Sequence, residues 1–283
     1  MQPSARGLIL DLLSTLRRGT MPVGALVEAG ALFGIAGNSL RVALTRLLVA
    51  GYVARDERGR YRLGPSAEPV ERRVHSWREL DRATRAWTPC SWLAVHHDAA
   101  VKTRRPADRG RERALRLLGF RRLEPGLSLR PDNLRGGVEG VRRELRMLGL
   151  PQAHPVFAVT ALDPAHEARA RELWDAERLR ASYRRRLADI EKSTARIGRV
   201  GVEDAMVESF LLGGAIIREL VLDPLLPDAI CPAAERRALV DALRRYDRLG
   251  RSAWADFLKR FDVPHIRTPL DGALAVAPER LAV

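Results

Sequence analysis

The sequence predicts an α+β fold made of several domains. The chain has 283 residues, which exceeds the usual size of one compact domain. In its first and last thirds, apolar residues recur at spacings of three and four, the pattern of amphipathic helices. In its middle third, short apolar runs are bounded by glycine and proline, which is typical of strands. Helical ends around a mixed centre indicate the α+β class.

The first 68 residues predict a winged helix-turn-helix domain. Helices are expected over residues 4–17, 23–33 and 38–51. Asn38 is placed to cap the third helix, and Gly51 resembles a C-cap. The short link before the third helix contains Gly34 and Gly37, as in a helix-turn-helix motif. Alternating residues on both sides of Gly59 then predict a hairpin, which in this position is a wing.

The middle of the chain predicts a linker, a connecting helix and a ferredoxin-like domain. The proline-containing stretch 64–69 marks the linker, and residues 70–87 predict a helix within a connecting segment 69–90. In the next domain, 91–163, strands are expected at 91–95, 120–123, 127–130 and 155–161, with helices at 106–118 and 137–148. The resulting order, βαββαβ, is that of a ferredoxin-like unit.

The last part of the chain predicts a helical bundle over residues 164–262. Segments with helical spacing run over 165–175, 177–197, 202–222, 231–249 and 252–260. Aromatic residues at helical spacing in these segments are expected in the core rather than in a ligand site. The final stretch, 263–283, has two prolines and weak periodicity, so we expect a loosely docked tail.

The balance of charge favours a polyanionic partner. Lysine and arginine number 49 against 35 aspartate and glutamate, a formal net charge of +14. Nucleic acid and an acidic membrane surface both suit such a charge. The chain has neither a signal peptide's order of charges nor the roughly 20 consecutive apolar residues of a membrane span. Since Cys90 and Cys231 form no metal or redox motif, we expect a cytoplasmic protein with no membrane partner.

The third predicted helix carries the strongest candidate site. Leu40, Leu44 and Leu47 anchor one side of it, and at about 100° per residue the opposite side carries polar and small groups. The expected DNA contacts of this helix are Asn38, Ser39, Arg41, Val42, Thr45 and Arg46. In a major groove, arginine pairs with guanine, asparagine with adenine, and a Thr or Val methyl touches thymine. An exposed helix of a protein–protein module is the alternative interpretation.

The predicted wing carries three further candidates, Arg55, Arg58 and Arg60. We expect them to straddle phosphates or to enter the minor groove. Such contacts supply affinity that depends on salt rather than sequence reading. A solvated surface hairpin is the alternative.

His96, His97 and Asp98, at the end of a predicted strand, invite a metal-dependent nuclease interpretation. One carboxylate from each subunit of a dimer can hold a divalent cation for phosphodiester cleavage. Adjacent histidines on a strand, however, point to opposite faces. We therefore favour loop residues or dimer contacts, and we predict no metal and no catalytic residue here.

Three stretches of the chain carry a family resemblance. They are LRVALTRL at 40–47 followed by GY at 51–52, the segment 118–127 that begins LGF and ends PGL, and LDPLLP at 222–227. With them, over about residues 4–258, the chain resembles the PaaX family of bacterial repressors, named for the control of phenylacetic acid degradation. It departs from the family pattern at 96–100 and at 231–234, which leaves the identity of the effector open.

The resemblance implies a homodimer that binds palindromic operator DNA through its winged helices. It also implies dimerisation through the central domain and effector sensing in the helical domain. The effector in relatives is an aryl acyl-CoA thioester, typically phenylacetyl-CoA. Arg184, Arg185 and Arg186 are candidate contacts for its phosphates, with simple solvation as the alternative.

We therefore predict a ligand-responsive, DNA-binding transcriptional repressor of a catabolic operon, with no cofactor. Ligand binding is expected to change the separation of the two winged helices, so that both recognition helices no longer fit their half-sites. Two alternatives are a metal-dependent nuclease that uses the central domain and an architectural protein with equal affinity for all duplexes.

Overall fold

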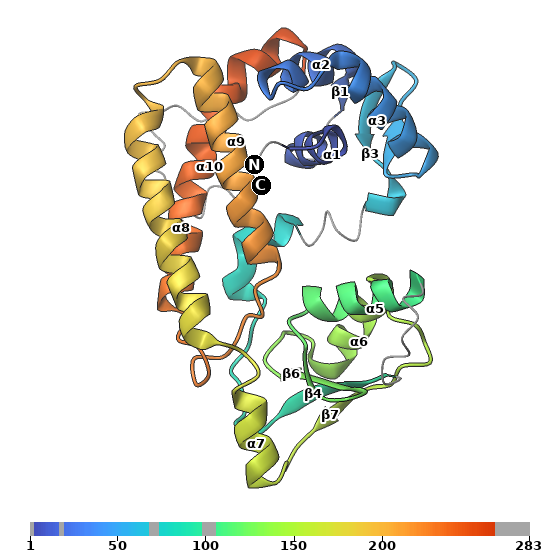
Figure 1. The fold of residues 1–283 in the computed structure, drawn as a ribbon, viewed down its shortest axis with the longest axis vertical. Helices are drawn as coiled ribbons and strands as arrows, with labels where there is room; N and C mark the ends of the chain where they lie inside the picture. Colours follow the sequence, from blue (N-terminus) through green and yellow to red (C-terminus); the bar gives the residue numbers. More distant parts are fainter. Residues whose placement is uncertain (1–2, 17–19, 68–73, 98–105, 264–283) are drawn as a thin grey trace. The chain divides into compact units, whose positions relative to one another are not determined.

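The computed structural model describes residues 3–16, 20–67, 74–97 and 106–263 (Figure 1). It is mixed α+β, with two small antiparallel sheets and a helical C-terminal region, which confirms the predicted fold class. Among the described residues, no helix combines the length and the apolar character needed to cross a bilayer. The predicted tail lies outside the described residues apart from Val263.

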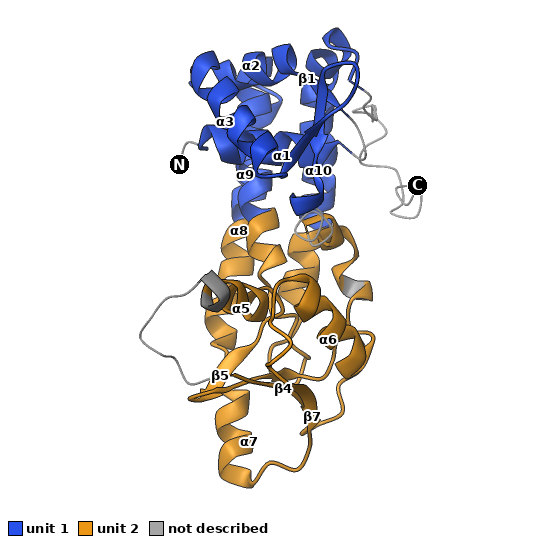
Figure 2. Cartoon of the chain, turned by 90° about the vertical axis from the view of Figure 1, so that its right-hand side faces the viewer, with its two compact units in different colours: residues 1–72, 188–216, 241–283 blue, residues 73–187, 217–240 orange. Residues whose placement is uncertain are grey.

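The chain forms two compact units, each discontinuous in sequence (Figure 2). Unit 1 comprises residues 1–72, 188–216 and 241–283, and unit 2 comprises 73–187 and 217–240. Three long helices contribute to both units, namely α8 (Ala176–Ile197), α9 (Val202–Val221) and α10 (Ala234–Arg260). Packing thus divides the chain differently from the linear series of domains that the sequence predicts.

Unit 1 begins with three helices and a three-stranded antiparallel sheet. The helices are α1 (Ala5–Thr15), α2 (Val23–Leu32) and α3 (Gly37–Val49). The strands lie in the order β1-β3-β2 and are β1 (Met21–Pro22), β2 (Val53–Arg55) and β3 (Arg60–Leu63). A 3-10 turn, η1 (Pro65–Ala67), follows. The three predicted helices and the hairpin are confirmed, whereas a strand as short as β1 has no alternating pattern to reveal it.

The predicted Asn38 cap is wrong, because α3 begins earlier. Ala36 is the N-cap residue, and no side chain caps the helix. Gly34 adopts a φ of 70°, and the N–H groups of Gly34 and Ile35 donate to carbonyls of α2. This tight turn lets the Ala36 carbonyl accept from Leu40 N at 3.1 Å, so Asn38 lies in the first turn of α3 with its side chain exposed.

The core of unit 1 joins α1–α3 to α9 and α10. Phe33, directly after α2, lies 5.3 Å from the ring centre of Phe210 in α9 and 6.5 Å from that of Trp254 in α10. The sequence predicts a helix break near Gly250, but α10 runs through it. A Cβ on Gly250 would lie 3.2 Å from Ser209, so this glycine permits close approach of α9 and α10 instead of ending a helix.

Unit 2 contains a four-stranded antiparallel sheet with the strand order β5-β6-β4-β7. Its elements are β4 (Trp92–His96), α5 (Pro106–Leu117), β5 (Arg121–Glu124), β6 (Leu127–Pro131), α6 (Gly137–Met147) and β7 (Val156–Val159). The predicted succession of four strands and two helices is confirmed. Helices α5 and α6 cover one face of the sheet (Figure 1). On the other face, Ala170 of α7 (Pro164–Arg171) packs with Trp174, whose ring stacks on that of Trp92 at 6.3 Å.

Of the connecting helix predicted over 70–87, the described part is helical only as far as Arg82, so its predicted end is wrong. A 3-10 helix, η2 (Ser76–Arg82), ends before Ala83. The backbone then bonds to the loop after β6 instead of continuing a helix. Arg85 N donates to Asn133 O at 2.8 Å, and Arg135 N donates to Ala83 O at 2.9 Å. Tertiary hydrogen bonds thus replace the helical bonds that the apolar spacing predicts.

Two of the stretches behind the family resemblance meet in unit 2. Arg130 of β6 is buried and donates to the carbonyl oxygens of Leu118 and Pro224 and, at 2.9 Å, to Asn133 Oδ1. Asn133 Nδ2 in turn donates to Leu225 O at 2.6 Å. This buried network fixes the 222–227 stretch against the turn that follows α5.

Gly119 permits the close approach of the 222–227 stretch, and its replacement tests how much that approach stabilises the protein. Its φ is +73°, and a Cβ would lie 2.6 Å from Pro224 Cα. We expect Gly119→Ala to lower the free energy of unfolding by about 2–4 kcal/mol, measured in urea, since strain and a backbone clash combine. Gly149→Ala is the control: φ is +102° there, but nothing lies within 4 Å. It should cost about 1–2 kcal/mol. Equal losses in both variants would contradict the importance of the Pro224 contact.

Candidate nucleic-acid interface

Helix α3 presents an exposed side made of the residues that the sequence singles out. Leu40, Leu44 and Leu47 are buried against the other helices. The exposed residues of the opposite side are Asn38, Ser39, Arg41, Val42, Thr45, Arg46 and Val49. Val42 is 45% exposed and Val49 is 87% exposed. These two valines provide apolar contact points on an otherwise polar helix surface.

The two arginines of α3 have free guanidinium groups. No hydrogen bond or ion pair to another described residue holds Arg41 or Arg46, although the backbone carbonyl of Arg41 accepts from Thr45 Oγ1 at 3.1 Å. Glu28, in α2, is paired with Arg260 at 2.6 Å. Both guanidinium groups are therefore available to an incoming acceptor without breaking an internal bond.

The β2–β3 hairpin separates its predicted arginines into two kinds. Arg55 is exposed and lies over the Tyr61 ring, with its guanidinium carbon 5.8 Å from the ring centre. Arg58 is exposed at the tip, where its N–H donates to Asp56 Oδ1 at 3.0 Å. Arg60 instead turns inward: its guanidinium donates to Thr20 Oγ1 at 2.9 Å and to Asp262 O at 2.8 Å. Arg55 and Arg58 are thus placed for a ligand, whereas Arg60 fastens the hairpin.

Arg62 is an exposed hairpin residue that the sequence analysis does not single out. It lies in β3 opposite Ala54, one position after the buried Tyr61. Strand alternation was the available signal, because it places Arg62 on the face of the hairpin opposite the buried Tyr61.

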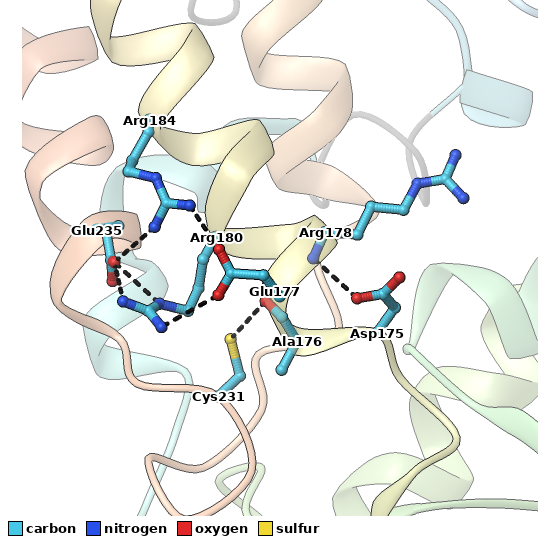
Figure 3. Close-up of polar contacts among 8 residues, drawn as sticks. All are labelled: Asp175, Ala176, Glu177, Arg178, Arg180, Arg184, Cys231 and Glu235. Carbon is cyan, nitrogen blue, oxygen red and sulfur yellow. Dashed lines mark hydrogen bonds and ion pairs between the residues drawn. The ribbon is translucent and has the colours of Figure 1, made fainter.

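The three candidate effector arginines do not converge on one site. Arg184 bridges Glu177 at 2.6 Å and Glu235 at 3.3 Å, as Figure 3 shows beside Arg180. Hydrogen bonds from Arg180 hold the pKa of Glu235 below its ordinary value. Arg186 donates through Nε to Glu219 in α9 at 2.8 Å. Arg185 donates to Ser182 Oγ at 3.1 Å. A phosphate would have to displace carboxylates from Arg184 and Arg186.

Unit 1 contains a groove of about 890 Å³ between α8, α9 and the end of α2. Leu32, Val207 and Leu211 supply apolar lining. The charged lining consists of the cations Lys192 and Arg196 and the carboxylates Asp189, Asp204 and Glu208. Arg196 is paired with Glu208 at 2.9 Å, and Glu208 also accepts from the buried Ser193. Leu32 is the last residue of α2, so the groove borders the turn that leads into α3.

The histidine pair at the end of β4 is only partly described. His96 is exposed, and His97 lies with Nε2 3.1 Å from Ser128 Oγ and its ring 6.4 Å from that of His154. Asp98 lies outside the described residues. Within the part of the chain that the structure describes, no three His, Cys, Asp or Glu side chains gather as metal ligands would.

Comparison with known proteins finds similarity to a solved structure. No family model matches the sequence, and no curated protein is detectably similar to it. A solved structure, that of the uncharacterized protein Rv0674 from Mycobacterium tuberculosis, is similar at 25% identity with a TM-score of 0.56. The similarity covers 88% of this chain and 98% of that one. The fold as a whole, rather than one domain of it, is therefore shared with that protein.

Proposed function

We propose that this protein is a DNA-binding transcriptional repressor that reads a duplex with α3. In this proposal, α1–α3 and β1–β3 form a winged helix-turn-helix, and the β4–β7 sheet with α5 and α6 forms a ferredoxin-like domain. The exposed side of α3 carries the proposal: free Arg41 and Arg46 flank Asn38, Val42 and Thr45. These residue types match the donors, acceptors and methyl groups of base edges in a major groove.

A second step of the proposal concerns the partner chain. Operators with two half-sites about one helical turn apart need two copies of the reading helix. We infer a homodimer, as the resemblance to the PaaX family implies. The strand order β5-β6-β4-β7 leaves β7 at an edge of its sheet, which is consistent with a central domain that takes part in dimerisation.

Purified protein mixed with duplex DNA and Mg²⁺ or Mn²⁺ separates the proposal from the nuclease alternative. We expect the DNA to be bound and to remain intact. Competition with unrelated duplexes then separates it from an architectural protein, because a repressor binds its preferred sequence about 10³-fold or more tightly than other DNA. Cleavage, or equal affinity for every duplex, would contradict the proposal.

We propose that the effector is an aryl acyl-CoA thioester such as phenylacetyl-CoA and that it binds in the groove of unit 1. Its apolar residues suit an aryl acyl chain, and Lys192 suits a phosphate. A molecule there contacts Leu32 and so bears on the turn before α3. Only a ligand that binds one state of the protein more tightly than the other shifts DNA binding.

Leu211→Trp tests this placement. The indole would fill the groove, so we expect phenylacetyl-CoA to lose its effect on DNA affinity. Affinity without ligand should stay within about twofold, or about 0.4 kcal/mol, because Leu211 lies in α9 and not in the proposed reading helix. Fluorescence anisotropy with labelled duplex measures both. Arg184→Gln, which lies away from the groove lining, is the control and should respond like wild type. A normal response in Leu211→Trp would refute the groove as the effector site.

A further inference from the structure

A row of exposed arginines lies along α5 in unit 2. Arg109, Arg113 and Arg116 are all exposed, and their spacing of four and three residues puts them on one face of the helix. Arg121, exposed in β5, continues the row beyond the end of α5. Helix α5 is labelled in Figures 1 and 2. We call these four residues the α5 arginine row.

Among the described residues, the α5 arginine row has no acidic partner. Within the described chain, the four side chains make one hydrogen bond, from Arg121 Nη1 to the backbone carbonyl of Phe120 at 3.2 Å. Glu112, exposed on the same helix, forms no ion pair with any of the four. Other arginines of unit 2 do pair with acids, as Arg169 does with Glu124 at 2.6 Å and Arg171 with Glu167 at 2.8 Å.

Two cations of the row, Arg116 and Arg121, are close enough to repel one another. Desolvation of the Arg121 side chain and the positive charge of Arg116 both lower the pKa of Arg121. Like charges gathered without counter-charges destabilise the folded protein, and an anionic ligand would relieve that repulsion.

The row also lacks the apolar anchors of a protein–protein interface. The exposed large hydrophobic residues of the described chain are Val42, Val49, Met147, Phe157, Val202 and Leu222, none of them in α5 or β5. Buried aromatic and arginine anchors carry most of the affinity between proteins, and the row offers arginines with no exposed aromatic residue in α5 or β5. Helix rise puts Arg109 and Arg116 about 10 Å apart, a length of duplex that carries about six phosphate charges.

We propose that the α5 arginine row binds the phosphate backbone of the duplex that the protein occupies, as a second contact surface apart from α3. This inference rests on the proposed DNA-binding function. It assigns the row to affinity and not to sequence reading, because guanidinium–phosphate contacts carry no base information.

The test is the salt dependence of duplex binding by the full chain with Arg109, Arg113 and Arg116 all changed to glutamine. The logarithm of the binding constant is measured against the logarithm of salt concentration. Each lost phosphate contact reduces the slope by about 0.9, so we expect a reduction of about 2.7. The ratio of affinities for preferred and unrelated duplexes should stay unchanged.

The matched control changes three exposed arginines elsewhere, Arg178, Arg199 and Arg237, to glutamine. It removes the same charge and should leave the slope near that of the wild type. If the triple α5 variant folds poorly, Arg113→Gln alone should reduce the slope by about 0.9.

The outcomes separate this inference from the proposed function. If the wild type binds duplex DNA and the α5 variant keeps its slope, the row does not contact phosphate and the inference is overturned. If the α5 variant shows a reduced salt slope for single-stranded RNA but not for duplex DNA, the inference is overturned in favour of an RNA partner. If the wild type binds no duplex at all, the proposed function fails first and the inference with it.

Discussion

Replacing Arg41 and Arg46 together with alanine is expected to weaken binding to a preferred duplex by about 2–6 kcal/mol, since each base or phosphate contact contributes about 1–3 kcal/mol. At about 1.4 kcal/mol for each tenfold change, this is a loss of roughly 30-fold to 10⁴-fold in affinity. Both guanidinium groups are exposed and free of internal bonds within the described chain, so the fold should be unaffected.

The measurement is fluorescence anisotropy with a duplex enriched by the wild type from a random library. Thermal unfolding checks that the variant is folded. Arg199 and Arg237 changed together to alanine are the control, because they are exposed arginines outside α3. Affinity equal to that of the wild type would end the assignment of α3 as the reading helix.

Arg130→Met is expected to lower the free energy of unfolding by about 3–5 kcal/mol. The substitution leaves the carbonyls of Leu118 and Pro224 and the amide of Asn133 without the donor that they share. An unpaired buried polar group costs about 1–3 kcal/mol, and here three acceptor oxygens lose their donor at once. Methionine keeps much of the volume, so the cost comes from hydrogen bonds rather than from a cavity.

Urea unfolding of Arg130→Met measures the loss, with Arg113→Met as the control. Arg113 is exposed and lacks an internal partner among the described residues, so its substitution should change stability by no more than about 0.5 kcal/mol. Similar stabilities of the two variants would show that the buried network does not hold the 222–227 stretch in place.

Local periodicity is sufficient to predict most elements of this fold. The leucines of α3 are buried at the positions that helical spacing indicates, and the four strands of unit 2 lie within one or two residues of their predicted bounds. These elements have one apolar side and one polar side, and that difference is written directly in the sequence.

The errors occur where distant parts of the chain decide the backbone. Residues 83–85 bond to the loop after β6, so they leave the predicted helix, and Gly250 marks close packing against Ser209 rather than a helix end. The division into two discontinuous units has the same origin, because α8, α9 and α10 each pack in both. No window of consecutive residues contains such information.

The candidate site follows the same rule. The exposed side of α3 is predictable because burial of its leucines fixes the direction of the other residues. The inward turn of Arg60 toward Thr20 and Asp262 is not, since Asp262 is distant in sequence. The pairing of Arg184 in α8 with Glu235 in α10 is equally non-local. Because of it, a residue expected to contact the effector instead forms an ion pair between two helices.

Selection of duplexes from a random library by the full chain, followed by sequencing, tests most directly whether α3 reads DNA. We predict enrichment of one sequence with two related half-sites about 10 base pairs apart, or a multiple of that spacing. The enrichment should vanish for the variant that lacks Arg41 and Arg46. A library that comes through unchanged, or the same enriched sequence with that variant, would contradict the account.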